Sequence, residues 1–272
     1  MQFNQQHAII TGGSSGIGKA TAILLAKAGA HVSIIARSHS TLAAAKAEIE
    51  AARVSDTQKV VALSADVSER SQVEKAISDA IAQVGPPDLL ITSAGIAQPG
   101  YFQDIPIDVF ERTMAVNYFG TLYSIRAVLP AMETRQQGHI VLVSSGAALL
   151  GLFGYTPYSP SKFALRGLAE SLRGELKVKG IRTSIVYPPD TDTPQLAAEN
   201  KTKPLETKLI TGTAKTWQAQ GVAHEILKGI EKGRFAITPG LEMTLLEKLH
   251  SPLAPLLNRY FDYLGTKARR RL

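Results

Sequence analysis

The chain has 272 residues, of which 44% are hydrophobic and 19% charged, with no cysteine and a formal net charge of +7. The length is enough to bury a sizeable core, and the composition excludes a disordered, collagen-like or coiled-coil protein. Without cysteine the chain has no disulfide, thiolate metal site or cysteine nucleophile, and we expect no other metal site.

The sequence predicts no membrane-spanning segment. Residues 1–7 are polar and lead directly into an apolar run, so we expect no signal peptide. No uncharged apolar run reaches the roughly 18 residues that a spanning helix needs. The nearest one, 140–158, contains Ser144, Ser145 and Pro157 and is better interpreted as a strand followed by a loop. We therefore expect a cytoplasmic protein in which any membrane contact is peripheral.

Apolar runs alternate with helical patterns along most of the chain. The sequence predicts strands at Ala8–Thr11, His31–Ala36, Val60–Ser64, Asp88–Ser93, His139–Val143, Thr183–Tyr187 and Phe235–Thr238. It predicts helices at Lys19–Ala28, Thr41–Arg53, Glu69–Val84, Ile107–Arg135, Ser159–Lys179 and Val222–Lys232. Apolar strands separated by helices are typical of a parallel sheet covered on both faces. We expect a single Rossmann-like, doubly wound α/β domain over residues 1–240.

Two segments depart from this alternation. The first, about 190–221, is a polar insertion that we interpret as a lid over the substrate site. The second, 241–272, is a helical extension whose leucines and aromatic residues recur at near-helical spacing, interrupted by Pro252 and Pro255. This extension would pack on the body or on a second subunit. Alternatively, it would lie on a membrane surface or line a lipid entrance.

The positive charge is concentrated in a basic tail at the end of the extension. The last eight residues contain Lys267, Arg269, Arg270 and Arg271 and no acid, so subtracting these four charges from +7 leaves +3 for the rest of the chain. The nearly neutral body has no interleaved basic and aromatic face, and we expect no nucleic-acid partner. Anionic lipid headgroups would suit the tail if the extension meets a membrane.

A glycine-rich turn joins the first predicted strand to the first predicted helix. Its glycines, in residues 11–19, have the spacing G-x-x-x-G-x-G. They permit a tight turn and let the backbone approach a pyrophosphate at the helix N-terminus, although a flexible connector is the alternative. We expect cofactor contacts from Gly12, Ser14, Ser15, Gly16, Ile17 and Gly18.

The end of the second strand indicates which dinucleotide binds. An NAD site would carry an acid there, on the ribose 2′-hydroxyl. This chain has Arg37 instead, which suits a 2′-phosphate, with Ser38 as a hydrogen-bonding partner. The sequence therefore predicts NADPH/NADP+ as the cofactor, with a surface arginine at a helix start as the alternative.

Two more strand ends are candidate cofactor contacts. Asp66 and Val67 follow the third strand and suit a cap over the adenine, although Asp66 also suits a helix cap or turn. Ser93, Ala94 and Gly95 end the fourth strand and suit a close approach of the backbone to the cofactor, with a tight turn as the alternative for Gly95.

Tyr158 and Lys162 are four residues apart at the start of a predicted helix, so they share one face. A tyrosine hydroxyl has a reference pKa of about 10 and is a poor proton shuttle at neutral pH. A nearby ammonium would stabilise the phenolate and lower that pKa. A surface pair is the alternative for this common spacing.

Two polar residues accompany this pair. Ser145, at the end of the fifth strand, would hold a substrate carbonyl against Tyr158. Ser144 competes for this role, and because adjacent strand residues face opposite ways, only one should face the cleft. Asn117 lies in a helix among apolar neighbours, which favours a buried amide that anchors water or orients Lys162 over a solvent-facing one.

The ordered motifs resemble the classical short-chain dehydrogenase/reductase family over about residues 5–240. They are T-G-x-x-x-G-x-G, S-A-G, N, S and Y-x-x-x-K. The resemblance implies a catalytic tetrad of Asn117, Ser145, Tyr158 and Lys162. Tyr158 would donate a proton to the carbonyl oxygen while the nicotinamide delivers hydride to the carbon, and Lys162 would also bind the nicotinamide ribose.

The segment after the sixth strand is also matched to the family. The family's Pro-Gly is Pro188-Pro189 here, which makes the start of the substrate loop stiffer. Thr193 matches the threonine that binds the carboxamide, with Thr191 nearby. The resemblance further implies a homodimer or homotetramer formed through the long helices around Asn117 and Tyr158.

Longer stretches narrow the resemblance to reductases of 3-ketodihydrosphingosine, also called 3-ketosphinganine. These stretches are residues 152–159, 163–170, 187–194 and 199–207. The resemblance implies NADPH-dependent reduction of this long-chain ketone in sphingolipid synthesis. The alternatives are a reductase of another ketone, such as a 3-oxoacyl or steroid-like compound, or a non-catalytic NADP-binding sensor.

Overall fold

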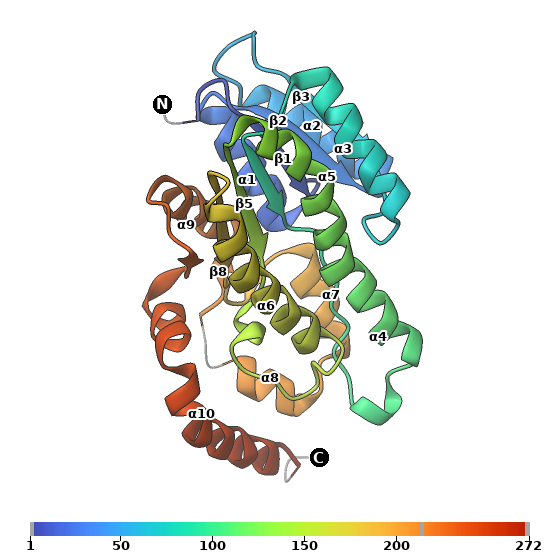
Figure 1. Cartoon of the computed structure of the whole chain (residues 1–272). Coiled ribbons are helices and arrows are strands. Elements are labelled where there is room, and N and C mark those ends of the chain that lie inside the picture. The colour runs from blue at the N-terminus through green and yellow to red at the C-terminus, as the bar shows by residue number, and fades with distance from the viewer. Residues whose placement is uncertain (1–2, 213–214, 270–272) are drawn as a thin grey trace.

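The protein is built on one parallel sheet of seven strands, seen in the computed structural model, which describes residues 3–212 and 215–269 (Figure 1). The strands lie in the order β3-β2-β1-β4-β5-β6-β9. Their bounds are β1 (His7–Thr11), β2 (His31–Ala36), β3 (Val60–Ser64), β4 (Leu89–Thr92), β5 (Gly138–Val143), β6 (Ile181–Val186) and β9 (Ala236–Ile237). The order reverses between β1 and β4, and ligands bind at the carboxyl ends of strands beside such a switch point.

Alternate side chains along the strands pack into two hydrophobic cores, one on each face of the sheet. Ile9 of β1 belongs to one buried cluster and Ile10 to the other. The first face is covered by α3 (Arg70–Val84), α5 (Gly120–Arg135) and α6 (Tyr158–Lys177), and the second by α1 (Gly16–Lys27), α2 (His39–Ala51) and α9 (Ala219–Glu231). The predicted Rossmann-like doubly wound sheet is therefore confirmed.

The long helix predicted over Ile107–Arg135 is three elements. A π-helical turn, η2 (Ala115–Phe119), separates α4 (Ile107–Met114) from α5. The wider turn inserts an extra residue, and such turns are frequent at functional sites. Gly120 follows directly, and a Cβ there would lie 2.9 Å from Val67 Cβ. The helix therefore changes its pitch where it passes closest to the loop after β3.

The insertion after β6 folds into a small structured cover. It contains β7 (Thr191–Asp192), α7 (Pro194–Thr202), α8 (Leu205–Thr211) and β8 (Trp217–Gln218), and β7 pairs with β8 in parallel. Two short helices, η1 (Phe102–Asp104) and η3 (Gly146–Ala148), lie in loops that follow β4 and β5. In Figure 1, α7 and α8 lie beyond the lower end of the sheet, next to α6.

The C-terminal extension is one helix, α10 (Gly240–Arg269), which continues through Pro252 and Pro255 and changes direction along its length (Figure 1). An internal proline removes a backbone hydrogen bond and bends a helix. Met243 and Leu264 are buried, whereas Leu245 and Leu256 are more than half exposed. No helix among the described residues is both long and apolar enough to cross a bilayer. Of the basic tail, Arg270 and Arg271 lie outside the described residues.

Candidate active site

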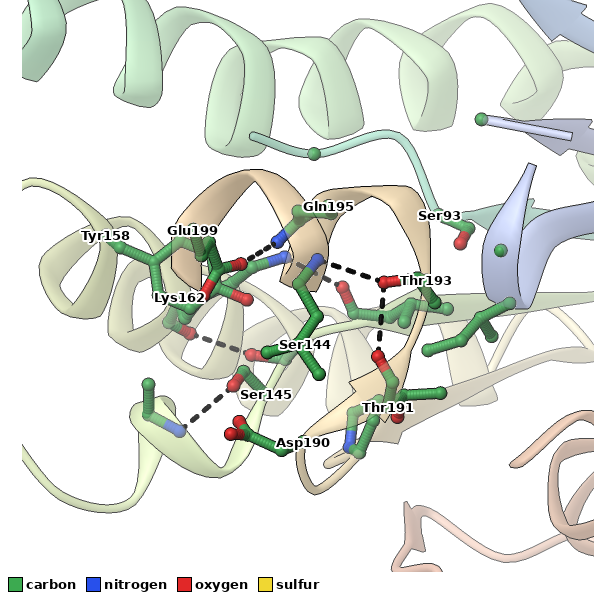
Figure 2. A pocket seen from close by; sticks show the side chains of 18 of the residues that line it. Ser93, Ser144, Ser145, Tyr158, Lys162, Asp190, Thr191, Thr193, Gln195 and Glu199 are labelled. Atoms are coloured by element: carbon green, nitrogen blue, oxygen red, sulfur yellow. Dashed lines mark hydrogen bonds between the residues drawn. The ribbon is translucent and has the colours of Figure 1, made fainter. Parts of the chain in front are cut away.

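A cavity of about 180 Å³ lies at the carboxyl ends of β1, β4, β5 and β6, under α7 (Figure 2). It brings together residues that are far apart in the sequence, because the loops after several strands meet where the strand order reverses. Its lining includes the predicted site residues Gly12, Ser15, Gly16, Ile17, Ser93, Ala94, Gly95, Ser145, Tyr158, Lys162, Pro188, Thr191 and Thr193.

The glycine-rich turn is shaped by close backbone contacts. Gly12 has φ +70°, and a Cβ there would lie 2.6 Å from Ala94 N. A Cβ on Gly18 would collide with the carbonyl oxygen of Gly12. Any larger residue at either position would displace the turn from β4 or from the first turn of α1. The turn therefore presents α1 directly to the cavity, as a dinucleotide pyrophosphate requires.

A second cavity, of about 240 Å³, continues from the first along the ends of β1, β2 and β3. Its lining includes Gly12, Ser14, Arg37, Ser38, Asp66, Val67, Ala94 and Gly95. The two cavities share three residues, Gly12, Ala94 and Gly95. Together they form one elongated site along the switch point, with an arginine at the end farther from Tyr158.

Arg37 lies at the outer end of this second cavity with a half-exposed side chain. Its Nη1 is 3.8 Å from Asp66 Oδ2, and Arg112 Nη2 is 3.3 Å from the same oxygen. Burial acts to raise the pKa of Asp66, but hydrogen bonds from Ser68 and the two arginines hold it below its usual value. Sequence reasoning missed Arg112, which reaches this site from α4. Ser38 also caps α2, accepting from Thr41 N at 3.4 Å.

Tyr158 and Lys162 occupy the first two turns of α6, and both side chains are buried. Lys162 Nζ lies 5.4 Å from the centre of the Tyr158 ring and donates to the carbonyl oxygen of Val143 at 3.2 Å. The expected shared face is therefore present, and both side chains line the cavity rather than the surface.

The expected fall in the pKa of Tyr158 is not found. Burial raises this pKa, the negative charge of Glu199 raises it further, and hydrogen bonding by Ser145 and Gln195 opposes the rise. Burial also lowers the pKa of Lys162 to about 8, and Glu199 opposes that fall. The prediction was wrong because it considered the lysine alone. In the cavity, loss of solvent and a carboxylate raise this pKa, and hydrogen bonds with Ser145 and Gln195 only partly oppose the rise.

The two adjacent serines have different partners. Ser144 Oγ donates to the carbonyl oxygen of Lys162 at 3.1 Å and is buried. Ser145 Oγ accepts from Ala147 N at 3.1 Å at the start of η3, and Ser145 hydrogen bonds to Tyr158. Both residues line the cavity, so the expectation that only one would face the cleft is wrong, because β5 ends at Val143 and strand alternation does not continue through this pair. Ser144 is engaged in holding α6, which leaves Ser145 as the serine directed to the tyrosine.

Asn117 is fully buried in the π-helical turn η2. Its Oδ1 accepts from Ile96 N at 2.8 Å, and its Nδ2 donates to Ile96 O at 3.0 Å and to Ser161 Oγ at 2.9 Å. These bonds engage its amide with the loop after β4 and with α6, and its expected role of anchoring water or orienting Lys162 stays a prediction. Asn117 therefore links the loop after β4 to α6 beside Gly95. A Cβ on Gly95 would lie 3.5 Å from Lys162 Nζ.

The threonines after β6 shape the start of the insertion. Thr193 caps α7, accepting from Leu196 N at 3.2 Å and donating to Thr191 O at 3.2 Å. Thr191 is buried and donates to Pro189 O at 2.8 Å. A Cβ on Gly16 would lie 3.0 Å from Thr193 Cγ2. The insertion and the glycine-rich turn therefore meet at the cavity.

Sequence reasoning missed a carboxylate of the lid, Glu199. Its Oε2 accepts from Tyr155 OH at 2.6 Å, and its Oε1 accepts from Gln195 Nε2 at 2.8 Å. All three side chains line the cavity, with Glu199 beside Tyr158 and Lys162 (Figure 2). Its helical spacing to Gln195 was the available signal, but no pattern in the polar insertion marked this face as the inner one.

The chain is similar to known oxidoreductases in sequence and in fold. A family model described as short chain dehydrogenase matches residues 6–204. A 3-ketodihydrosphingosine reductase of Bos taurus is 47% identical, over 92% of this chain and 76% of the relative. A 3-dehydrosphinganine reductase of Danio rerio is 45% identical, over 94% and 77%. The solved structure of a short chain dehydrogenase/reductase from Burkholderia phymatum in complex with NAD superposes with a TM-score of 0.82 at 24% identity, covering 94% of this chain and 96% of that one.

Proposed function

The chain belongs to the short chain dehydrogenase family, and from this premise we propose that it reduces 3-ketosphinganine to sphinganine with NADPH. The observation that carries the proposal is the identity of 45–47% with relatives named as reductases of this ketone. The cavity supports it, because a buried tyrosine, lysine and serine adjoin a glycine-rich turn at the sheet switch point.

The residues fit a nicotinamide dinucleotide. Gly12 and Gly18 hold a cradle that a Cβ would fill, and the elongated cavity runs from this cradle to Arg37. When bound, the reduced nicotinamide supplies a hydride equivalent to the ketone carbon. The adenosine end would lie among Asp66, Val67 and Arg37, and the nicotinamide end near Tyr158 and Lys162.

The protein's own residues complete the reduction. Ser145 holds the ketone oxygen beside Tyr158, which donates its hydroxyl proton to that oxygen as the carbon accepts hydride. The product is an alcohol, and Tyr158 is left as a phenolate, which the Lys162 ammonium stabilises until a proton returns from solvent. Asn117 is a positioning residue in this scheme, because its amide bonds hold the Ile96 backbone and Ser161.

Incubating the purified protein with 3-ketosphinganine and NADPH tests this proposal. Sphinganine should accumulate, with one NADPH consumed for each molecule formed. A protein that binds NADPH but forms no sphinganine would contradict the proposal and favour the NADP-binding sensor.

Cofactor choice should depend on Arg37. We expect Arg37→Asp to lower kcat/KM for NADPH by about 10- to 100-fold, because a charge-assisted hydrogen bond to the 2′-phosphate is lost and a like charge faces it. Activity with NADH should fall much less or rise. Initial rates with both cofactors measure this.

The matched control for Arg37 is Arg126→Asp, which makes the same charge change at an exposed residue of α5. It should leave the ratio of kcat/KM with NADPH to kcat/KM with NADH at the wild-type value. An unchanged ratio in Arg37→Asp would mean that Arg37 is a surface arginine.

The homodimer or homotetramer, the cytoplasmic location and the membrane contact of α10 stay predictions.

A further inference from the structure

Glu199 is a buried carboxylate on the inner face of the lid helix α7. It is 6% exposed, and its two oxygens accept one hydrogen bond each, from Tyr155 and Gln195. Within residues 3–212 and 215–269, Glu199 forms no ion pair. A buried carboxylate is costly unless a cation accompanies it, and each of its oxygens can accept a further hydrogen bond.

The other carboxylate that lines the cavity already has an ion-pair partner. Asp190 pairs with Lys203 at 3.5 Å, and the Lys203 side chain is only 2% exposed. Lys162 Nζ is bonded to the Val143 carbonyl oxygen. Glu199 is therefore the carboxylate of this group whose charge is left facing the cavity (Figure 2).

The charge of Glu199 acts directly on the reacting centre. It raises the pKa of Tyr158, and it opposes the fall in the pKa of Lys162 that burial causes. Tyr155 also stacks at a tilt against Tyr158, with ring centres 5.5 Å apart. Tyr155 also donates to the Glu199 carboxylate. A substrate group that contacts the Tyr158 hydroxyl is therefore bound near that carboxylate.

We propose that Glu199 binds the ammonium group of the substrate and selects 2-amino ketones over ketones that lack the amine. The inference rests on the proposed function. In 3-ketosphinganine the amine is on the carbon next to the carbonyl carbon, so a carbonyl oxygen held by Ser145 and Tyr158 brings the ammonium group toward the lid. An ion pair that also hydrogen bonds is a strong contact in such a site.

This arrangement also rejects other ketones. A 3-oxoacyl thioester or a steroid-like ketone has no cation beside its carbonyl, so its binding would bury Glu199 without a cation in direct contact with it. Specificity gained in this way comes from the penalty on the wrong substrate as much as from the contact with the right one.

The test compares two substrates in two proteins. The substrates are 3-ketosphinganine and the same long-chain hydroxy ketone without its amino group, and the proteins are wild type and Glu199→Gln. We expect wild type to prefer the amino ketone and Glu199→Gln to lose about 10- to 100-fold of that preference in kcat/KM. The ratio is used because the loss of charge near Tyr158 affects both substrates.

Glu206→Gln is the matched control. Glu206 is also a buried lid glutamate that accepts from a tyrosine, Tyr101 OH at 3.1 Å, but it lies on α8 outside the lining of the catalytic cavity. In Glu206→Gln the ratio of kcat/KM for the amino ketone to kcat/KM for the ketone without the amine should equal that of wild type. An unchanged ratio in Glu199→Gln, with both rates lowered alike, would make Glu199 a lid-positioning residue and overturn the inference. Absence of turnover of 3-ketosphinganine by wild type would overturn the proposed function and this inference together.

Discussion

Replacing Tyr158 with phenylalanine is expected to lower kcat on 3-ketosphinganine by about 10²- to 10⁴-fold, the usual effect of removing a positioned general acid. The hydroxyl is the only group that changes. The ring keeps its contacts with Tyr155 at 5.5 Å and with Lys162 at 5.4 Å. NADPH binding, measured by fluorescence titration, should stay near the wild-type value, because the cradle of the glycine-rich turn is untouched.

Tyr187→Phe is the control for this variant. Tyr187 is also buried, but it lies at the end of β6 in the core and does not line the catalytic cavity. Removing the Tyr187 hydroxyl should leave kcat within a few-fold of the wild-type value. Turnover by Tyr158→Phe at the wild-type rate would show that another group supplies the proton.

Replacing Lys162 with methionine should lower kcat by a similar factor, about 10²- to 10⁴-fold. Burial and the Glu199 charge both raise the pKa of Tyr158, so the phenolate formed during proton donation needs the ammonium more than an exposed tyrosine would. The same substitution at Lys177, an exposed residue at the end of α6, serves as the control and should leave kcat unchanged.

The pKa of Lys162 also predicts how kcat depends on pH. Burial lowers its pKa to about 8, so the ammonium is present below that pH and is lost as the pH rises through it. The wild-type kcat should therefore fall above about pH 8, and Lys162→Met should lack that fall. A wild-type rate that keeps rising to pH 10 would contradict the assignment.

The sheet was predictable because its strands are buried on both faces. Runs such as Leu89–Thr92 are almost entirely apolar and lie between helical patterns, so their positions follow from the sequence alone. The two-residue strands β7 and β8 carry no such pattern, since they are too short to bury a face. The π-helical turn also escaped prediction, because the helical pattern runs through residues 115–119 without a break in the sequence.

The candidate site was predictable where one motif holds several residues. Gly12, Gly16 and Gly18 lie in one short turn of the sequence, and Tyr158 and Lys162 lie one helical turn apart. Residues that reach the site from another element and belong to no recognised motif were not predicted. Arg112 reaches Asp66 from α4, and Glu199 reaches Tyr155 from the lid.

The error about the pKa of Tyr158 has the same origin. Local spacing identified the lysine that would lower it, but the burial and the carboxylate that raise it come from the folded cavity. Asn117 is a related case. Its burial followed from its apolar neighbours, whereas its partners, Ile96 and Ser161, depend on how β4's loop and α6 meet.

The most direct test is NADPH oxidation by the purified protein with 3-ketosphinganine and with a 3-oxoacyl thioester of similar chain length, measured side by side. The buried cavity with Tyr158, Lys162 and Glu199 predicts rapid oxidation with 3-ketosphinganine, formation of sphinganine, and a much lower kcat/KM with the thioester. Oxidation of NADPH with the thioester but not with 3-ketosphinganine would contradict the proposed function.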